Sequence, residues 1–195
     1  IDGAERGIST GGDLSYYYTL GSLSEDGLLP FRDYWSEFPP IWPMFYVTAY
    51  NLTASGGVGN YTSFASVLAL LMVAFDVGNL VLIKWIGERL HGRDTGLALA
   101  WLYALMLAPL IFLFWTFETM VAFTLLLSVW WLLNGQDDRS AVAAAVGGLI
   151  KFVPLVILGA VWRFRGWRAA LRYTVIALVL FALAYVIVIA ATGEM

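Results

Sequence analysis

The sequence contains no cysteine and a single histidine, His91, among its 195 residues. Without cysteine the chain has no disulfide, no iron–sulfur cluster, no thiol nucleophile and no cysteine-ligated zinc. One histidine also argues against a histidine-based metal site and against a Ser-His-Asp triad. Chemistry carried by this chain therefore depends on carboxylates, hydroxyls, arginines and lysines.

Charged residues are scarce. They make up 13% of the chain, against about 25% in a typical soluble domain. Hydrophobic residues reach 61%, more apolar surface than a soluble domain of this length could cover. This composition excludes an ordinary cytosolic enzyme and a disordered chain. Aromatic residues at 16%, including nine tryptophans, are typical of proteins that contact membrane interfaces.

The charge is also unevenly distributed. Residues 1–40 carry seven acids and two bases, a net charge of −5, and residues 41–195 carry a net charge of +2. No stretch has the basic density of a nucleic-acid-binding surface, so we expect no nucleic-acid partner. We predict two parts: an external loop with short juxtamembrane or interfacial helices at 1–62, and a transmembrane helical module at 63–195.

Long apolar runs predict an all-α, polytopic transmembrane helical bundle, because a helix satisfies all its backbone groups within lipid and the runs are too long for barrel strands. Residues 41–54 are apolar but reach only ~21 Å, less than the ~30 Å hydrocarbon core. They form either an interfacial or re-entrant helix or a span with poorly marked ends. The predicted crossing segments are 63–86, 95–114, 119–133 and 173–191.

Basic residues set the expected orientation. They cluster at 84–93 and at 163–172, and positive charge favours the cytoplasmic side. The two segments between 95 and 133 make two crossings, which also places the loop at 134–140 in the cytoplasm. Residues 1–62 are then expected on the non-cytoplasmic side.

The apolar segment 141–162 must then start and finish on the same side. It is interrupted by Lys151-Phe152-Val153-Pro154, and proline disfavours a continuous helix. We therefore predict a broken, re-entrant helix pair around Lys151–Pro154. The alternative is a single kinked helix with the last arginine cluster outside.

Two acids in the N-terminal region could carry chemistry. Asp13 precedes a tyrosine run that includes Tyr17, and a carboxylate there could act as a general base on a hydroxyl acceptor. By residue type alone, a turn or N-cap role is the more common one for an aspartate after two glycines. Glu37 is followed by Phe38-Pro39-Pro40, which would fix a carboxylate at the membrane surface. The alternative is an acidic first turn of a proline-started helix.

Two further residues could contact a substrate. Arg32 has the fork of donors that suits a phosphate, or it could pair with its neighbour Asp33. Glu118 lies at the non-cytoplasmic mouth of a predicted helix, where an acid complements the helix dipole or could face an active site.

Polar residues inside the apolar segments are functional candidates because they are costly in lipid. Asp76 and Asn79 lie within the first full crossing, where they could instead join two helices. Lys151 requires an anion or water, and could meet a lipid phosphate or a buried carboxylate such as Asp76. The alternative for Lys151 is snorkelling to the interface.

Several segments together resemble the GT-C superfamily of integral-membrane glycosyltransferases, and in particular bacterial mannosyltransferase-like members that use polyprenyl-phosphate sugars. The likeness runs from about Asp13 to Trp162. Phe38 stands where the family usually has tyrosine. The segments that carry the resemblance are Asp13 with Tyr16 and Tyr17, residues 27–33 (GLLPFRD), 37–40 (EFPP), 108–109 with 115–118 (AP and WTFE), and 147–154 (GGLIKFVP).

The resemblance implies transfer of a sugar from a polyprenyl-phosphate donor to a hydroxyl on a lipid, glycolipid or protein by one inverting displacement, with no cofactor and no obligatory metal. Asp13 would be the base, Arg32 and Lys151 would neutralise the phosphate, and Glu37 and Glu118 would orient sugar hydroxyls or the loop. Tyr17 is a further predicted substrate-binding residue. The family places a transmembrane helix before the acidic loop, so we expect the sequence, which starts at Ile1, to be a fragment of a longer protein.

Two other classes remain open. The chain could be a non-catalytic membrane subunit or scaffold that assembles with partner membrane subunits. It could also be a transporter in which Asp76 and Lys151 form a midplane site, although the sequence shows no inverted repeat.

Overall fold

The computed structural model describes residues 13–54, 60–106 and 116–192, and every regular element in these ranges is helical. The all-α prediction is therefore confirmed. Two short 3-10 helices cover Leu23–Asp26 and Val153–Val156. The α-helices are α1 (Asp13–Ser22), α2 (Ile41–Ala54), α3 (Tyr61–His91), α4 (Arg93–Leu105), α6 (Glu118–Leu133), α7 (Asp137–Gly148), α8 (Ile157–Arg165) and α9 (Trp167–Thr192).

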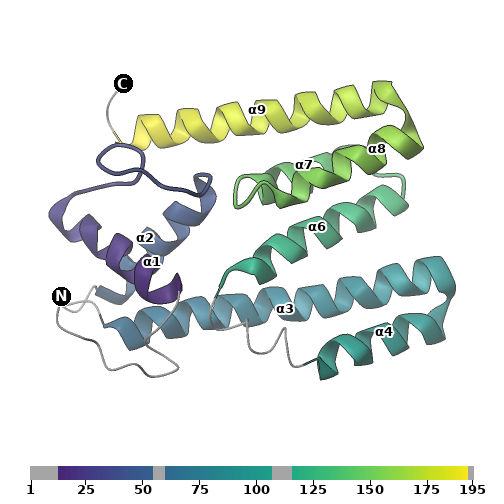
Figure 1. The fold of residues 1–195 in the computed structure, drawn as a ribbon, viewed down its shortest axis with the longest axis horizontal. Coiled ribbons are helices and arrows are strands. Elements are labelled where there is room, and N and C mark those ends of the chain that lie inside the picture. Colours follow the sequence, from purple (N-terminus) through teal and green to yellow (C-terminus); the bar gives the residue numbers. More distant parts are fainter. Residues whose placement is uncertain (1–12, 55–59, 107–115, 193–195) are drawn as a thin grey trace.

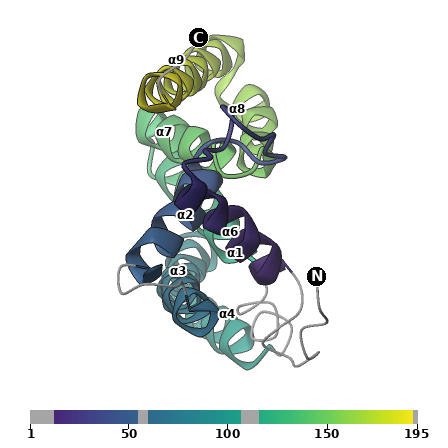
Figure 2. The same ribbon diagram turned by 90° about the vertical axis from the view of Figure 1, so that its left-hand side faces the viewer.

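Two long helices, α3 and α9, define the length of the molecule. With 31 and 26 residues they extend ~46 Å and ~39 Å, and both are long and apolar enough to cross a membrane. Figure 1 shows α6, α7 and α8 between them toward one end, and α1 and α2 between them toward the other. In Figure 2, α1 and α2 lie between α3 and the group of α7, α8 and α9.

The apolar segment 141–162 is broken, as its sequence predicted. Helix α7 ends at Gly148, the second 3-10 helix follows, and α8 begins at Ile157. The chain reverses direction between α7 and α8 (Figure 1), which agrees with a helical hairpin and not with a single kinked helix. The α3–α4, α6–α7 and α8–α9 connections consequently lie at the same end of the molecule.

Three connections are shorter than predicted. In the basic stretch 163–172, which precedes the predicted crossing at 173–191, only Gly166 separates α8 from α9. Helix α3 continues through the basic segment to His91, where Lys84 pairs with Glu88 four residues later at 2.7 Å, and only Gly92 separates it from α4. Helix α7 begins at Asp137, because two acids in its first turn complement the helix dipole. Of the predicted crossing at 95–114, residues 107–114 lie outside the described part.

Polar side chains within α3 join it to neighbouring helices. The Tyr103 hydroxyl on α4 donates to Asp76 Oδ1 at 2.5 Å, and Asn79 Nδ2 donates to the backbone oxygen of Thr119 on α6 at 3.0 Å. These contacts match the helix-joining alternative for Asp76 and Asn79.

The largest core joins the N-terminal region to the helical module. It is rich in aromatic residues, and Gly21 permits the close approach of α1 to α2, because a Cβ there would lie 2.8 Å from Tyr50 Cβ. Residues before and after position 62 share this core, so α1 and α2 are fixed against α3 and α6. Its buried members are Leu14, Tyr17, Trp42, Tyr46, Val47, Ala49, Tyr50, Phe64, Leu68, Met72, Phe117, Met120, Val121 and Ile150.

Candidate functional site

The turn after α7 brings Lys151 to the start of α6. The backbone N–H of Lys151 donates to Gly147 O at 2.9 Å, which holds the lysine at the end of the helix. Its ammonium group forms an ion pair with Glu118, the first residue of α6, and lies 5.6 Å from the centre of the Phe117 ring. Two predicted site residues, 33 positions apart, therefore meet. The carboxylate partner of Lys151 is Glu118 and not Asp76, which accepts a hydrogen bond from Tyr103.

The spacing of Gly147, Lys151 and Pro154 has a packing reason. Gly147 is buried against the Thr124 side chain of α6 and against Pro154, and a Cβ at this position would lie 2.7 Å from Pro154 Cγ. Glycine lets α7 approach α6 closely, and the proline lies at the second position of the second 3-10 helix. The turn between them positions Lys151 over Phe117.

Aromatic rings form the floor beneath this ion pair. The Trp42 and Phe117 rings stack with centres 4.3 Å apart, and Phe38 meets Phe117 edge-on at 4.9 Å. Tyr17 meets Trp42 edge-on at 5.0 Å and stacks on Tyr46 at 5.7 Å. Apart from the partly buried Phe38, these side chains are at most 2% exposed, so the floor is shielded from solvent.

The charges of three acids act on the buried Tyr17 phenol. Burial raises the pKa of Tyr17 well above its ordinary range, and the negative charges of Asp13, Glu37 and Glu118 raise it further. The carboxylates themselves remain exposed, Asp13 at the first residue of α1 and Glu37 just before α2. Asp13, Glu37 and Glu118 are thus all near enough for their charges to act on Tyr17, and the contact that the structure shows directly is the ion pair of Glu118 with Lys151.

Arg32 is engaged elsewhere. Its guanidinium pairs with Asp33 at 2.7 Å and donates to the backbone oxygen of Gly27. The hydrogen bond that Arg32 Nε donates to Asp33 Oδ2, together with one from the Leu29 N–H, lowers the pKa of the Asp33 carboxyl. The contacts close the 27–34 loop, in which Phe31 has a φ of 68°. This matches the alternative in which Arg32 pairs with its neighbour, and its binding of a phosphate stays a prediction.

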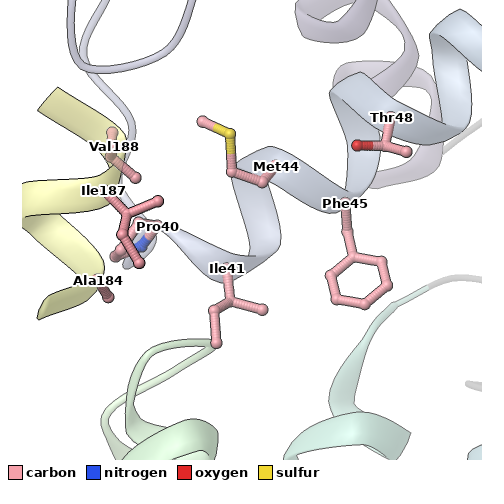
Figure 3. Close-up of a pocket in the computed structure, with 8 residues that line it drawn as sticks. All are labelled: Pro40, Ile41, Met44, Phe45, Thr48, Ala184, Ile187 and Val188. Carbon is pink, nitrogen blue, oxygen red and sulfur yellow. The ribbon is translucent and has the colours of Figure 1, made fainter. Parts of the chain in front are cut away.

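An apolar groove lies between α2 and the C-terminal part of α9 (Figure 3). Its volume is about 350 Å³, within the range of small-molecule pockets, and its lining is almost entirely hydrocarbon. The Ile41 N–H, at the start of α2, donates to Leu149 O at 3.0 Å, so the groove borders the turn that carries Lys151. The groove is lined by Pro40, Ile41, Met44, Phe45, Thr48, Ala184, Ile187 and Val188.

Sequence reasoning missed the aromatic floor. Trp42 and Tyr46 belong to a segment, 41–54, that is apolar on every side, so the face turned toward Tyr17 could not be identified. In the sequence Phe117 stands out only as the neighbour of Glu118. The one available signal was the density of aromatic residues between 34 and 50.

Comparison with protein-family models, with curated proteins and with solved structures finds no match for this chain. Among residues 13–54, 60–106 and 116–192, no three histidine or acidic side chains come together as metal ligands. What the site can do chemically therefore has to be argued from its own residues. These are exposed carboxylates beside a paired ammonium group, over a buried aromatic floor, next to an apolar groove.

Proposed function

We propose that this chain is a membrane glycosyltransferase, similar to the GT-C superfamily, that moves a sugar from a polyprenyl-phosphate donor to a hydroxyl acceptor on the non-cytoplasmic face. The observation that carries the proposal is the grouping of Asp13, Glu37, Glu118 and Lys151 around Tyr17 and Phe117. These residues come from four separate segments of the chain. Their meeting at one place is what a shared substrate site requires.

The membrane part of the proposal is supported by α3 and α9, which are apolar and long enough to cross. Large apolar side chains of α9, such as Leu178 and Val186, face outward, and they would be stable in lipid. Since the α3–α4 and α8–α9 turns carry the basic residues and lie at one end (Figure 1), that end is cytoplasmic and α1 and α2 are not. The shorter helices complete a multi-pass bundle.

In the proposed reaction Asp13 accepts the proton of the acceptor hydroxyl. The acceptor oxygen bonds to the anomeric carbon while the bond from that carbon to the phosphate oxygen breaks, and the polyprenyl phosphate leaves with the electron pair. Lys151 shares its positive charge between Glu118 and the leaving phosphate. The anomeric configuration inverts, because there is one displacement and no covalent intermediate.

The donor lipid has a matching surface. The groove between α2 and α9 is lined by hydrocarbon and borders the Lys151 turn through the hydrogen bond from Ile41 to Leu149. An isoprenoid chain in this groove would place its phosphate near the ammonium group. Holding donor and acceptor in one place supplies the proximity that accelerates a two-substrate reaction.

The proposal is tested by reconstituting the full chain in liposomes with radiolabelled polyprenyl-phosphate mannose and a short-chain glycolipid that has free hydroxyls. We expect label in the glycolipid, in a linkage of the opposite anomeric configuration to that of the donor. A folded chain that produces no labelled glycolipid and co-purifies with stoichiometric membrane proteins would instead indicate the non-catalytic subunit. The outward apolar face of α9 would fit such a partner.

The transporter interpretation has less support. It requires Asp76 and Lys151 to share a site, but the two side chains have separate partners, Tyr103 and Glu118.

A further inference from the structure

The turn between α8 and α9 presents arginines and large aromatic residues together. Helix α8 ends at Arg165 and α9 starts at Trp167, and Gly166 between them has a φ of 88°. This left-handed conformation lets the chain reverse in one residue. Residues 162–168 (WRFRGWR) are all exposed as a result.

The four arginines of this region divide into two pairs. Arg165 and Arg172 pair with acids at the start of α7 and hold the turn against the α6–α7 connection, Arg165 through Asp137 at 3.5 Å and through Leu132 O at 2.8 Å. Arg172 pairs with Asp138. Their charges are therefore already balanced by carboxylates of this chain.

Arg163 and Arg168 differ from Arg165 and Arg172, which pair with acids of this chain. Within the described residues neither forms an ion pair with a carboxylate, and each instead lies over an aromatic ring of its neighbour. The distances are 5.7 Å from Arg163 to the Phe164 ring and 5.5 Å from Arg168 to the Trp167 ring. Phe164 is 76% exposed and Trp167 63% exposed. The turn thus offers two uncompensated positive charges on an aromatic surface.

We propose that this turn is a binding surface for anionic phospholipid headgroups. The inference rests on the membrane part of the proposed function and not on sugar transfer. The turn begins the apolar helix α9, so when α9 spans the bilayer the turn lies at the depth of the headgroups. Tryptophan and phenylalanine rings favour that depth, and the two free guanidinium groups complement a lipid phosphate.

A lipid surface fits these residues better than a free anion does. A site for free phosphate would enclose the ion within converging donors, whereas Arg163 and Arg168 lie on an open turn beside exposed rings. The exposed rings are stable in an apolar layer, and the acyl region of a membrane provides one directly below the headgroup phosphates. An anionic phospholipid matches both features of the turn: its phosphate complements the two guanidinium groups, and its acyl region receives the exposed rings.

The test uses the full chain in detergent, titrated with short-chain phosphatidylglycerol, with phosphatidylcholine of the same chain length, and with inorganic phosphate. Bound lipid is counted by native mass spectrometry. We expect phosphatidylglycerol to bind more tightly than phosphatidylcholine, and R163Q/R168Q to reduce its affinity roughly fivefold per arginine. R163K/R168K should retain most of the affinity because it keeps the charge.

The control variant R89Q/R93Q removes the same charge from the α3–α4 turn and should bind phosphatidylglycerol as the parent does. Equal losses in both double variants would show that overall charge, and not this turn, attracts the lipid, and would overturn the proposal. Displacement of the lipid by millimolar phosphate would also overturn it, in favour of a free-anion site. A chain that is selective for phosphatidylglycerol but inactive in sugar transfer would refute only the enzyme proposal.

Discussion

We expect replacement of Asp13 with asparagine to lower the rate of the proposed sugar transfer by about 10²–10⁴-fold, the contribution typical of a general base. Asparagine keeps the size of the side chain and its suitability for a helix start, but cannot accept the proton at neutral pH. Because Asp13 is exposed at the first residue of α1, helix content should not change. Transfer from radiolabelled polyprenyl-phosphate mannose and circular dichroism measure the two quantities.

Asp26→Asn is the matched control. Asp26 is an exposed acid of the same N-terminal region, in the first 3-10 helix, and is not among the charges that act on Tyr17. Its substitution should leave transfer within about twofold of the parent rate, since it has no part in the proton transfer proposed for Asp13. If D13N is as active as D26N, Asp13 is not the base and the mechanism fails at its first step.

Replacing Gly96 with alanine reduces the free energy of unfolding by about 1–3 kcal/mol, because it overfills the contact between α3 and α4. A Cβ at Gly96 would lie 2.6 Å from Lys84 O and 2.8 Å from Glu88 N. These are backbone atoms of α3 and cannot rotate away, so the two helices must separate. Gly87 of α3 faces Gly96 and would lose the same close approach.

Gly159→Ala provides the comparison, since Gly159 lies in α8 and a Cβ there meets nothing within 4 Å. Alanine should leave stability unchanged or raise it by up to about 1 kcal/mol through its better helix propensity. Denaturant titration in detergent, followed by tryptophan fluorescence, gives both values. Equal stability of the two variants would mean that α3 and α4 do not pack as the structure has them.

Much of the secondary structure could be predicted from the sequence because its boundaries are chemically marked. The segment 41–54 forms α2 with the same bounds, and the interruption at Lys151–Pro154 does separate α7 from α8. The extents of α3 and α7 were underestimated. Charged residues predicted a loop after residue 86, whereas Lys84 and Glu88 form an ion pair across one turn of a continuous helix.

The sequence could predict which residues belong to the candidate site, but not which of them contact one another. Asp13, Glu37, Glu118 and Lys151 stood out because charge is rare in this chain. The ion pair between Lys151 and Glu118 depends on how α6 packs against α7. A segment that is apolar on every side does not show which of its faces packs against a neighbouring helix. The aromatic floor was missed for the same reason, since it is formed by contacts between distant segments.

Sided cysteine labelling tests whether the acidic site and the basic turns face opposite sides of a membrane. The chain has no cysteine of its own, so a single introduced thiol reports without background. Trp35→Cys marks the site end, where Trp35 is 83% exposed, and Gln136→Cys marks the exposed α6–α7 connection. In sealed vesicles we predict that an impermeant maleimide labels W35C only from the non-cytoplasmic side and Q136C only from the cytoplasmic side. Labelling of both thiols from the same side would contradict the account.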